Sequence, residues 1–234
     1  KALFQPFPYP EGNANFLVTI DGSAFPTKYV WKGRWGENQQ MPGVGTAWLI
    51  LVDAGGSMSS RIGDAKAIAN AFVNAMGAND IINIMAFDGK QVVKDSKWLS
   101  ASRKGEASAF VNGIGANYGS WGRTRPLANI IRAGVNDAFN ELGNVGSDIV
   151  VPMHQALVVI SDGAAGTDPS STGPGALMLT QHLSKGRFPE DNSALPKTPL
   201  PVISIWFPRT QIEELAQNAQ EFMMNLANPE FGGF

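Results

Sequence analysis

Hydrophobic positions follow two alternating patterns from Thr46 onward: short continuous apolar runs, and longer stretches whose apolar residues are three and four positions apart. The continuous runs are typical of strands buried on both faces of a sheet, and the spaced stretches are typical of amphipathic helices. The continuous runs predict strands at 46–53, 81–87, 155–162 and 201–207, and a short strand and loop are predicted within 90–99. The spaced stretches predict helices at 61–76, 103–114, 126–142, 176–185 and 211–226. This alternation predicts an α/β fold, with a doubly wound and mainly parallel sheet flanked by helices on both faces.

The N-terminal region has a different pattern. Residues 1–14 are rich in proline and aromatic side chains, which predicts an extended arm without a regular element. Strand-like runs at 16–20 and 28–31 follow, with Asp21-Gly22 as the turn signal between them. We therefore expect a β-hairpin after the arm.

The chain has 234 residues, of which 44% are hydrophobic, so it suits one large domain with a packed core. We expect residues 46–234 to form this domain, and residues 1–45 to form an arm and hairpin extension packed on it. The chain opens with Lys1 rather than Met and shows no charged-then-apolar leader, so we interpret it as a piece of a longer protein.

Composition argues against several classes of function. The formal charge is −2 and no long basic block occurs, so we expect no nucleic-acid partner, because phosphate binding needs a concentrated cationic face. No run reaches the roughly 18 apolar residues that a membrane span needs, so we expect no membrane insertion by this segment. Without cysteine, the chain has no disulfide, zinc–thiolate site or cysteine nucleophile. Charged residues make up 16%, below the average of about 25%, which we associate with exported bacterial proteins.

Two of the predicted buried strands end in an aspartate, Asp53 and Asp162. In open parallel sheets, ligands lie beyond the carboxyl ends of the strands, so both carboxylates are expected at the binding edge. Two carboxylates close together repel each other and are costly to desolvate, and a bound cation is the simplest compensation. The hydroxyls of Ser57 and Thr124 lie in loops before predicted helices and can face the same edge. Such an all-oxygen set suits Mg²⁺ or Mn²⁺.

The three segments that carry these residues resemble a known motif. The strand LILVDAGGSM, the loop GRTRPLANII and the strand LVVISDG resemble, in order and separation, the metal-ion-dependent adhesion site of von Willebrand factor type A domains. The family pattern is Asp-x-Ser-x-Ser, then a Thr, then an Asp, and the resemblance covers roughly Thr46 to Leu226. It implies that Asp53, Ser57, Thr124 and Asp162 hold Mg²⁺, or Mn²⁺ or Ca²⁺ in its place. It also implies that a Glu or Asp carboxylate of a protein partner fills the open coordination position.

Gly55 departs from this pattern. It stands where the family has the first serine, so one direct ligand is missing. Three explanations stay open: a natural weak site completed by water, a degenerate site in a domain that binds without metal, and a deliberate serine-to-glycine substitution. We expect weak Mg²⁺ binding, because water can replace a neutral oxygen in a partly hydrated shell.

The loop around Thr124 contains further candidate ligand-binding residues. They are Tyr118, Trp121, Arg123 and Arg125. Arginine can receive an acidic group by bidentate pairing, and exposed tyrosine and tryptophan are frequent in binding hot spots. An alternative of equal weight is that these side chains only fix the loop by packing. Taken singly, the aspartates and Thr124 are also typical of turns and helix caps, so the metal-site interpretation depends on their combination.

We interpret the chain as a non-catalytic protein-recognition or adhesion domain, secreted or on a bacterial surface. The main alternative is an intracellular, cytoplasmic subunit that acts with a ring ATPase in metal insertion or enzyme remodelling. A Mg²⁺-dependent hydrolase is disfavoured, because no lysine or second acidic residue can be placed beside Asp53. His154 and His182 lack a recognisable serine or carboxylate arrangement, and no Gly-x-Ser-x-Gly motif occurs, so we expect no enzyme activity.

Overall fold

The computed structural model describes residues 3–6, 16–20, 23–26, 45–116, 127–142, 144–145, 149, 152, 154–163, 200–208, 219–220, 222–224 and 226–227. The chain divides into two compact units, Lys1–Pro42 and Gly43–Phe234. Asp53 and Asp162 belong to the second unit.

The first unit contains an antiparallel sheet of the strands β1 (Leu3–Pro6), β2 (Phe16–Ile20) and β3 (Ser23–Pro26), in that order. β2 and β3 pair as a hairpin, with Ile20 opposite Ser23, as the turn signal Asp21-Gly22 predicts. The two turn residues themselves lie outside the described residues. Two predictions are wrong here. The arm contains the strand β1, whose terminal proline is tolerated because β1 is an edge strand. The second hairpin strand begins directly after the turn, and residues 28–31 lie outside the described residues. The packing of residues 1–45 on the domain stays a prediction.

The second unit is built around a sheet that has six strands within the described residues. They are β4 (Thr46–Asp53), β5 (Ile81–Phe87), β6 (Val92–Asp95), β7 (Leu99–Ser100), β8 (His154–Ser161) and β9 (Val202–Trp206). The helices are α1 (Ile62–Ala75), α2 (Lys104–Asn112) and α3 (Leu127–Leu142), and the 3₁₀ turns η1 (Gly56–Met58) and η2 (Ala101–Arg103) precede α1 and α2. Residues 219–220, 222–224 and 226 are also helical.

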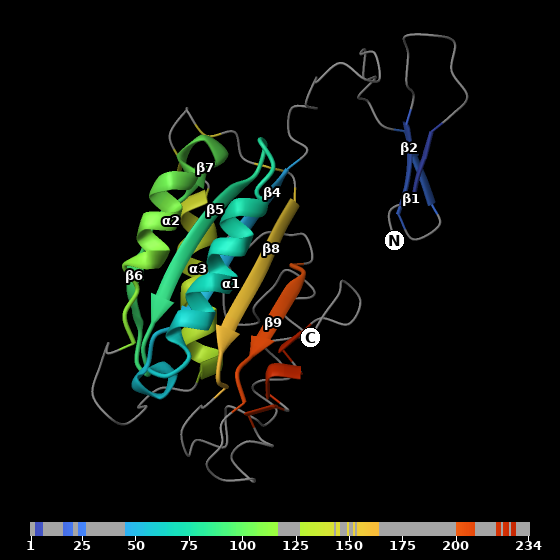
Figure 1. Cartoon of the computed structure of the whole chain (residues 1–234). Coiled ribbons are helices and arrows are strands. Elements are labelled where there is room, and N and C mark those ends of the chain that lie inside the picture. The colour runs from blue at the N-terminus through green and yellow to red at the C-terminus, as the bar shows by residue number, and fades with distance from the viewer. Residues whose placement is uncertain are drawn as a thin grey trace. The chain divides into compact units, whose positions relative to one another are not determined.

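The strands lie in the order β6-β5-β4-β8-β9, and β7 also pairs with β5. β4 is parallel to both β5 and β8, and β8 is parallel to β9, whereas β6 and β7 run antiparallel to β5. The arrowheads of β5, β8 and β9 therefore point to the same edge of the sheet (Figure 1). The chain winds from β4 to β5 on one side and returns to β8 on the other side of β4, so the order of strands reverses at β4. The predicted doubly wound, mainly parallel α/β fold is confirmed.

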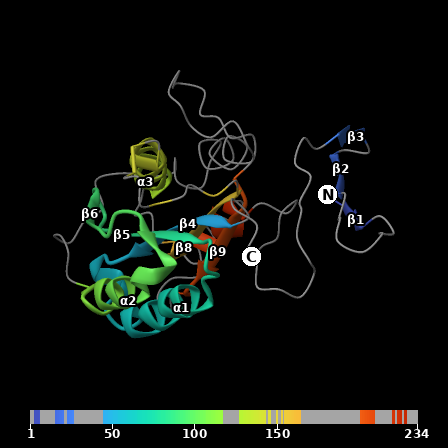
Figure 2. The ribbon, with the colours of Figure 1, turned by 90° about the horizontal axis from the view of Figure 1, so that it is seen from above.

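The two faces of the sheet are covered by different helices. Alternate residues of β4 enter two separate cores: Leu49 and Leu51 pack with α3 and the C-terminal helical residues, whereas Ile50 and Val52 pack with α1 and α2. Figure 2 shows α1 and α2 on one face of the sheet and α3 on the other. Burial on both faces explains why the central strands are continuously apolar in sequence.

In the second unit, the predicted elements agree with the structure where it describes them. The strands at 46–53 and 81–87 and the helices α1, α2 and α3 are confirmed, apart from terminal residues where helix ends commonly differ. The helix predicted at 176–185 lies outside the described residues. Of the helix predicted at 211–226, the described positions from 219 onward are helical.

The connection between β6 and β7 holds α3 in place through one buried hydrogen bond and a charged bridge. Trp98 Nε1 donates to the carbonyl oxygen of Ala138 at 2.8 Å. Beside it, Lys97 bridges Asp95 and Glu141, and its Nζ lies 2.7 Å from Asp95 Oδ2. The hydrogen bond to Asp95 and then the one to Glu141 raise the pKa of Lys97 above its ordinary value, so the bridge stays charged at neutral pH.

The substitution Trp98→Phe is expected to lower the free energy of unfolding by about 1–3 kcal/mol, because it removes the donor to Ala138 and leaves space around the ring. Urea denaturation followed by circular dichroism measures the change. Trp48→Phe is the matched control, since Trp48 is only half-buried and contacts Phe72 at a ring-centroid distance of 5.7 Å. Equal losses in the two variants would contradict a special contribution of the buried hydrogen bond.

Candidate metal centre

Asp53 ends β4 with a fully buried carboxylate whose two oxygens accept different hydrogen bonds. Oδ1 accepts from the backbone N–H of Gly55 at 2.9 Å, and Oδ2 accepts from the hydroxyl of Ser161 at 2.7 Å. Asp53 is 0% exposed. The carboxylate is therefore oriented from its own loop and from the neighbouring strand at once.

Ser161, which sequence reasoning missed, links the two predicted aspartates. Val52 pairs with Ile160, so the last residue of β8 lies beside the last residue of β4. Its hydroxyl donates to Asp53 and accepts from the N–H of Gly163 at 3.0 Å. A signal was present in the sequence, because a serine that closes a buried apolar run needs a hydrogen-bond partner.

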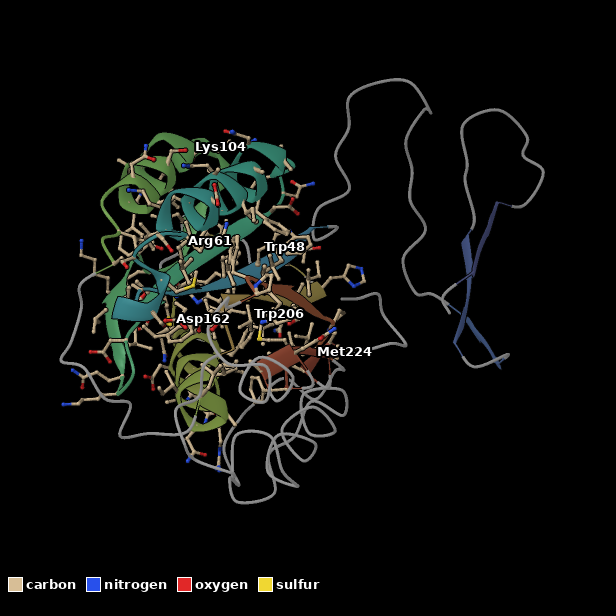
Figure 3. The ribbon with its side chains drawn as sticks, turned by 60° about the horizontal axis from the view of Figure 1, so that its bottom comes forward. Trp48, Arg61, Lys104, Asp162, Trp206 and Met224 are labelled. Atoms are coloured by element: carbon tan, nitrogen blue, oxygen red, sulfur yellow. The ribbon has the colours of Figure 1, made fainter. Side chains whose placement is uncertain are left out.

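Asp162 directly follows β8 and is 2% exposed. The indole N–H of Trp206 donates to its backbone carbonyl at 3.1 Å, and the two residues lie close together in Figure 3. The N–H of Phe207 donates to the carbonyl of Ser161 at 3.0 Å, so the end of β9 fixes the backbone on both sides of this position. As the strand ends predicted, Asp53 and Asp162 lie at the same edge of the sheet, on adjacent parallel strands.

Ser57 lies in η1, the turn that follows β4. The turn is anchored by Met58, which is 0% exposed and belongs to the core beneath α1 and α2. The N–H of Met58 donates to the carbonyl of Gly55 at 2.9 Å, and the N–H of Arg61 donates to the carbonyl of Met58 at 2.8 Å. The turn therefore keeps the half-buried Ser57 at the edge where Asp53 lies.

Gly55 does not have a conformation that requires glycine. Its φ is −64° and its ψ is 160°, an extended backbone that any residue adopts. Gly55 is also the N-cap residue of η1, where no side-chain cap is present and where serine is among the preferred residues. The backbone therefore suits a serine at the position where the resembled motif has one.

Gly163, in contrast to Gly55, has a backbone conformation that favours glycine. Its φ is +66°, in the left-handed region that favours glycine. A Cβ there would lie 2.8 Å from the carbonyl oxygen of Ala219 and 3.1 Å from Cγ of Met223. The loop after Asp162 thus lies directly against the C-terminal helical residues.

The other predicted site residues lie outside the described residues. They are Tyr118, Trp121, Arg123, Thr124 and Arg125. The described residues that flank them belong to different cores. Ile114 packs in the core beneath α1 and α2, and Leu127, the first residue of α3, packs in the core on the other face of the sheet. The flanks therefore lie on opposite faces of the sheet.

The donors that the structure does describe form a hard set. Asp53 and Asp162 supply carboxylate oxygens and Ser57 supplies a hydroxyl, which suits Mg²⁺ with part of its water shell retained. The described part of the chain contains no group of three or more His, Cys, Asp or Glu side chains that could hold a metal ion. A metal held at this edge therefore needs hydroxyl and water oxygens beside the two aspartates.

Comparison with known proteins gives similarity at the level of the fold. No protein-family model matches the chain, and no curated protein matches it. The chain is similar to the solved structure of a von Willebrand factor type A protein from Catenulispora acidiphila, with 14% identity and a TM-score of 0.45, over 92% of this chain and 45% of that one. It is also similar to the pilus adhesin SpaC from Lactobacillus rhamnosus GG, with 12% identity and a TM-score of 0.49, over 84% of this chain and 29% of that one.

A third similar structure is the vWF domain of the type V pili tip protein Mfa5 from Porphyromonas gingivalis. Its identity is 12% and its TM-score 0.45, over 82% of this chain and 89% of that domain. The chain spans less than half the length of the first two proteins. The fold class itself follows from the strand order and strand directions of this chain.

The substitution Gly163→Ala is expected to lower the free energy of unfolding by about 2–4 kcal/mol, because it adds a left-handed backbone penalty to a close contact with Ala219. Chemical unfolding measures the change. Gly56→Ala is the control: Gly56 is exposed, a Cβ there meets nothing within 4 Å, and the change should stay within about 0.5 kcal/mol. A loss at Gly163 as small as that at Gly56 would show that the loop does not need its close approach to the helix.

Proposed function

We propose that this chain is a non-catalytic recognition domain that binds an acidic group of a protein partner through Mg²⁺ at the carboxyl edge of its sheet. The observation that carries the proposal is the burial of Asp53 and Asp162 at the ends of two adjacent parallel strands. Burying two carboxylates at one edge is costly unless opposite charge compensates them. A divalent cation supplies that charge.

The residues that would hold the ion are Asp53, Ser57, Thr124 and Asp162. When bound, the ion supplies a positive centre with an open coordination position, which a Glu or Asp side chain of the partner can fill. Mn²⁺ or Ca²⁺ can take the place of Mg²⁺ at an all-oxygen site. Two hydrogen bonds orient the carboxylate of Asp53, and Ser57 lies in the anchored η1 turn, so these two donors need little ordering when the ion binds.

The flanks of residues 117–126 support a place for Thr124 in this site. Near the end of α2, Gly113 is bound by Lys94, a residue that pairs with Ala86 close to the end of β5. On the other face, Ala138 in the second half of α3 accepts a hydrogen bond from Trp98, which directly precedes β7. β7 pairs with the first residues of β5, so this part of α3 lies toward the edge where β5 begins. Its first residue, Leu127, is therefore directed toward the carboxyl edge. The described residues on both sides of residues 117–126 therefore lie toward the carboxyl edge of the sheet.

The sequence around Thr124 suits an acidic partner. Arg123 and Arg125 flank it and can pair with carboxylates, while Tyr118 and Trp121 offer the aromatic surface that is common in binding hot spots. We propose these four side chains as the rim that contacts the partner.

We place the domain outside the cell or on its surface, in keeping with its low content of charged residues. Among the helices that the structure describes, none has the length and apolar character needed to cross a membrane.

The substitution Gly55→Ser is expected to raise the affinity for Mg²⁺ by at least about tenfold, because it restores a direct hydroxyl ligand in a backbone that already suits serine. Isothermal titration calorimetry with MgCl₂ measures the affinity of the native chain and the variant. Asp162→Asn, made in the Gly55→Ser background, should remove the gain.

Gly56→Ser is the matched control for this experiment. It adds the same hydroxyl one residue away, at an exposed position with open space around it, and should leave Mg²⁺ affinity unchanged. Identical titrations of the native chain and Gly55→Ser would overturn the proposed metal site, and so would an equal gain in Gly56→Ser.

A further inference from the structure

The loop after β5 lies directly beside the loop after β4. Phe87, the last residue of β5, pairs with Asp53, and its carbonyl accepts a hydrogen bond from the N–H of Ala54 at 2.8 Å. β4 lies between β5 and β8 in the sheet, so residues 88–91 and Asp162 are on opposite sides of Asp53. Because neighbouring strands are about 4.8 Å apart, residues 88–91 begin within reach of a group bound at Asp53.

The buried carboxylate of Asp88 fixes the shape of the loop after β5. Asp88 is 5% exposed, and its Oδ1 accepts from the backbone N–H groups of Lys90 at 2.7 Å and Gln91 at 2.8 Å. The N–H of Asp88 donates in turn to the carbonyl of Gln91 at 2.9 Å. These hydrogen bonds close residues 88–91 into a turn, in which the backbone of Lys90 is held while its side chain is exposed.

Arg61 is a second exposed cation at this edge. It is the N-cap residue of α1, shortly after the turn that carries Ser57, and Figure 3 shows it at the edge of the sheet where Asp162 lies. Its side chain is 46% exposed, and its Nη1 lies 4.0 Å from Oδ2 of Asp64. An exposed ion pair contributes little free energy, so the guanidinium can exchange Asp64 for a carboxylate of a partner at low cost.

The exposed charges of these two loops do not serve metal binding. Among residues 54–61 and 88–91, the exposed charged side chains are Arg61 and Lys90, although the whole chain has a formal charge of −2. We call Arg61 and Lys90 the cation pair. A positive side chain near a metal ion weakens the binding of that ion, because like charges repel. Cations around a binding site instead favour an acidic partner, by speeding its association and by selecting against partners without negative charge.

We propose that the cation pair binds carboxylates of the partner other than the one that meets the ion. The partner is then an acidic segment with several Glu or Asp side chains, since a single carboxylate cannot occupy the open position of the ion and both cations. The inference rests on the proposed function and specifies the partner of the same site. Because Lys90 lies on the β5 side of Asp53, one of the further carboxylates lies on that side, away from Asp162.

The test uses the Gly55→Ser form with MgCl₂ and two synthetic peptides with capped ends. One peptide alternates Glu and Ser, and the other has a single central Glu among Ser residues. NMR titrations of the ¹⁵N-labelled protein measure both affinities. We expect the alternating peptide to bind more tightly. Lys90→Gln and Arg61→Gln should each weaken its binding about twofold to fivefold and make that binding less sensitive to NaCl. Both variants should leave binding of the single-Glu peptide nearly unchanged and should not lower the affinity for MgCl₂.

Arg103→Gln is the matched control. Arg103 is the N-cap residue of α2 and pairs with Glu106 three residues later, as Arg61 does with Asp64. It lies at the opposite edge, because α2 follows β7, which pairs with the first residues of β5. Its substitution removes the same charge and should leave the affinities for both peptides unchanged.

Equal affinities for the two peptides would overturn the cation pair, and so would the absence of binding by either peptide. A loss in Arg103→Gln as large as that in Lys90→Gln would do the same. If the alternating peptide binds equally well without metal and loses affinity in both variants of the cation pair, the pair recognises acidic segments and the proposed metal function is what fails. If MgCl₂ supports equal binding of both peptides in every form, the metal function holds and the cation pair is what fails.

Discussion

The hydrogen bond from the Ser161 hydroxyl to the buried carboxylate of Asp53 is the contact on which the candidate site depends. It joins the end of β4 to the end of β8, and it exists only because the doubly wound order makes these two strands neighbours in register. The same hydroxyl accepts a hydrogen bond from the N–H of Gly163, so one side chain is hydrogen-bonded to both segments that carry the predicted aspartates. The register between β4 and β8 therefore sets the relative positions of these residues, and a register shift of one residue would move Asp53 to the other face of the sheet.

Each loop at this edge is also attached to a core, and the two attachments lie on opposite faces. The loop after β4 is anchored by Met58 in the core beneath α1 and α2, and the loop after β8 lies against the C-terminal helical residues at Gly163. Packing of the two helical layers thus determines how the loops meet. Loosening either helical layer would therefore displace the loops that carry Asp53 and Asp162 as well as the apolar contacts.

Much of this arrangement could be predicted from the sequence, for a physical reason. Strands buried on both faces are continuously apolar, so the sequence predicts β4, β5 and, within one residue at each end, β8. The polar ends of β4 and β8 stand out in the sequence as Asp53 and Asp162. Ser161 was missed because a single hydroxyl at a strand end has no period to reveal it. The strand β1 was missed because pairing at a sheet edge overrides the local preference of a proline-rich run. The sequence around Thr124 has neither the strand pattern nor the helix pattern of apolar positions. It therefore identifies candidate residues there but does not predict their positions in the fold.

Gly55 and Gly163 flank the same site and have opposite requirements. At Gly163 the backbone itself demands glycine, through a left-handed φ and a close approach to Ala219. At Gly55 the backbone is extended, so the residue contributes only the absence of a side chain. Its N–H already orients Asp53, and that hydrogen bond does not depend on which side chain is present. Gly55 therefore differs from the serine of the resembled motif by the absent hydroxyl and not by a backbone conformation that excludes serine. In the proposed metal centre, a hydroxyl at such a position would add a ligand while the backbone N–H continued to orient the aspartate.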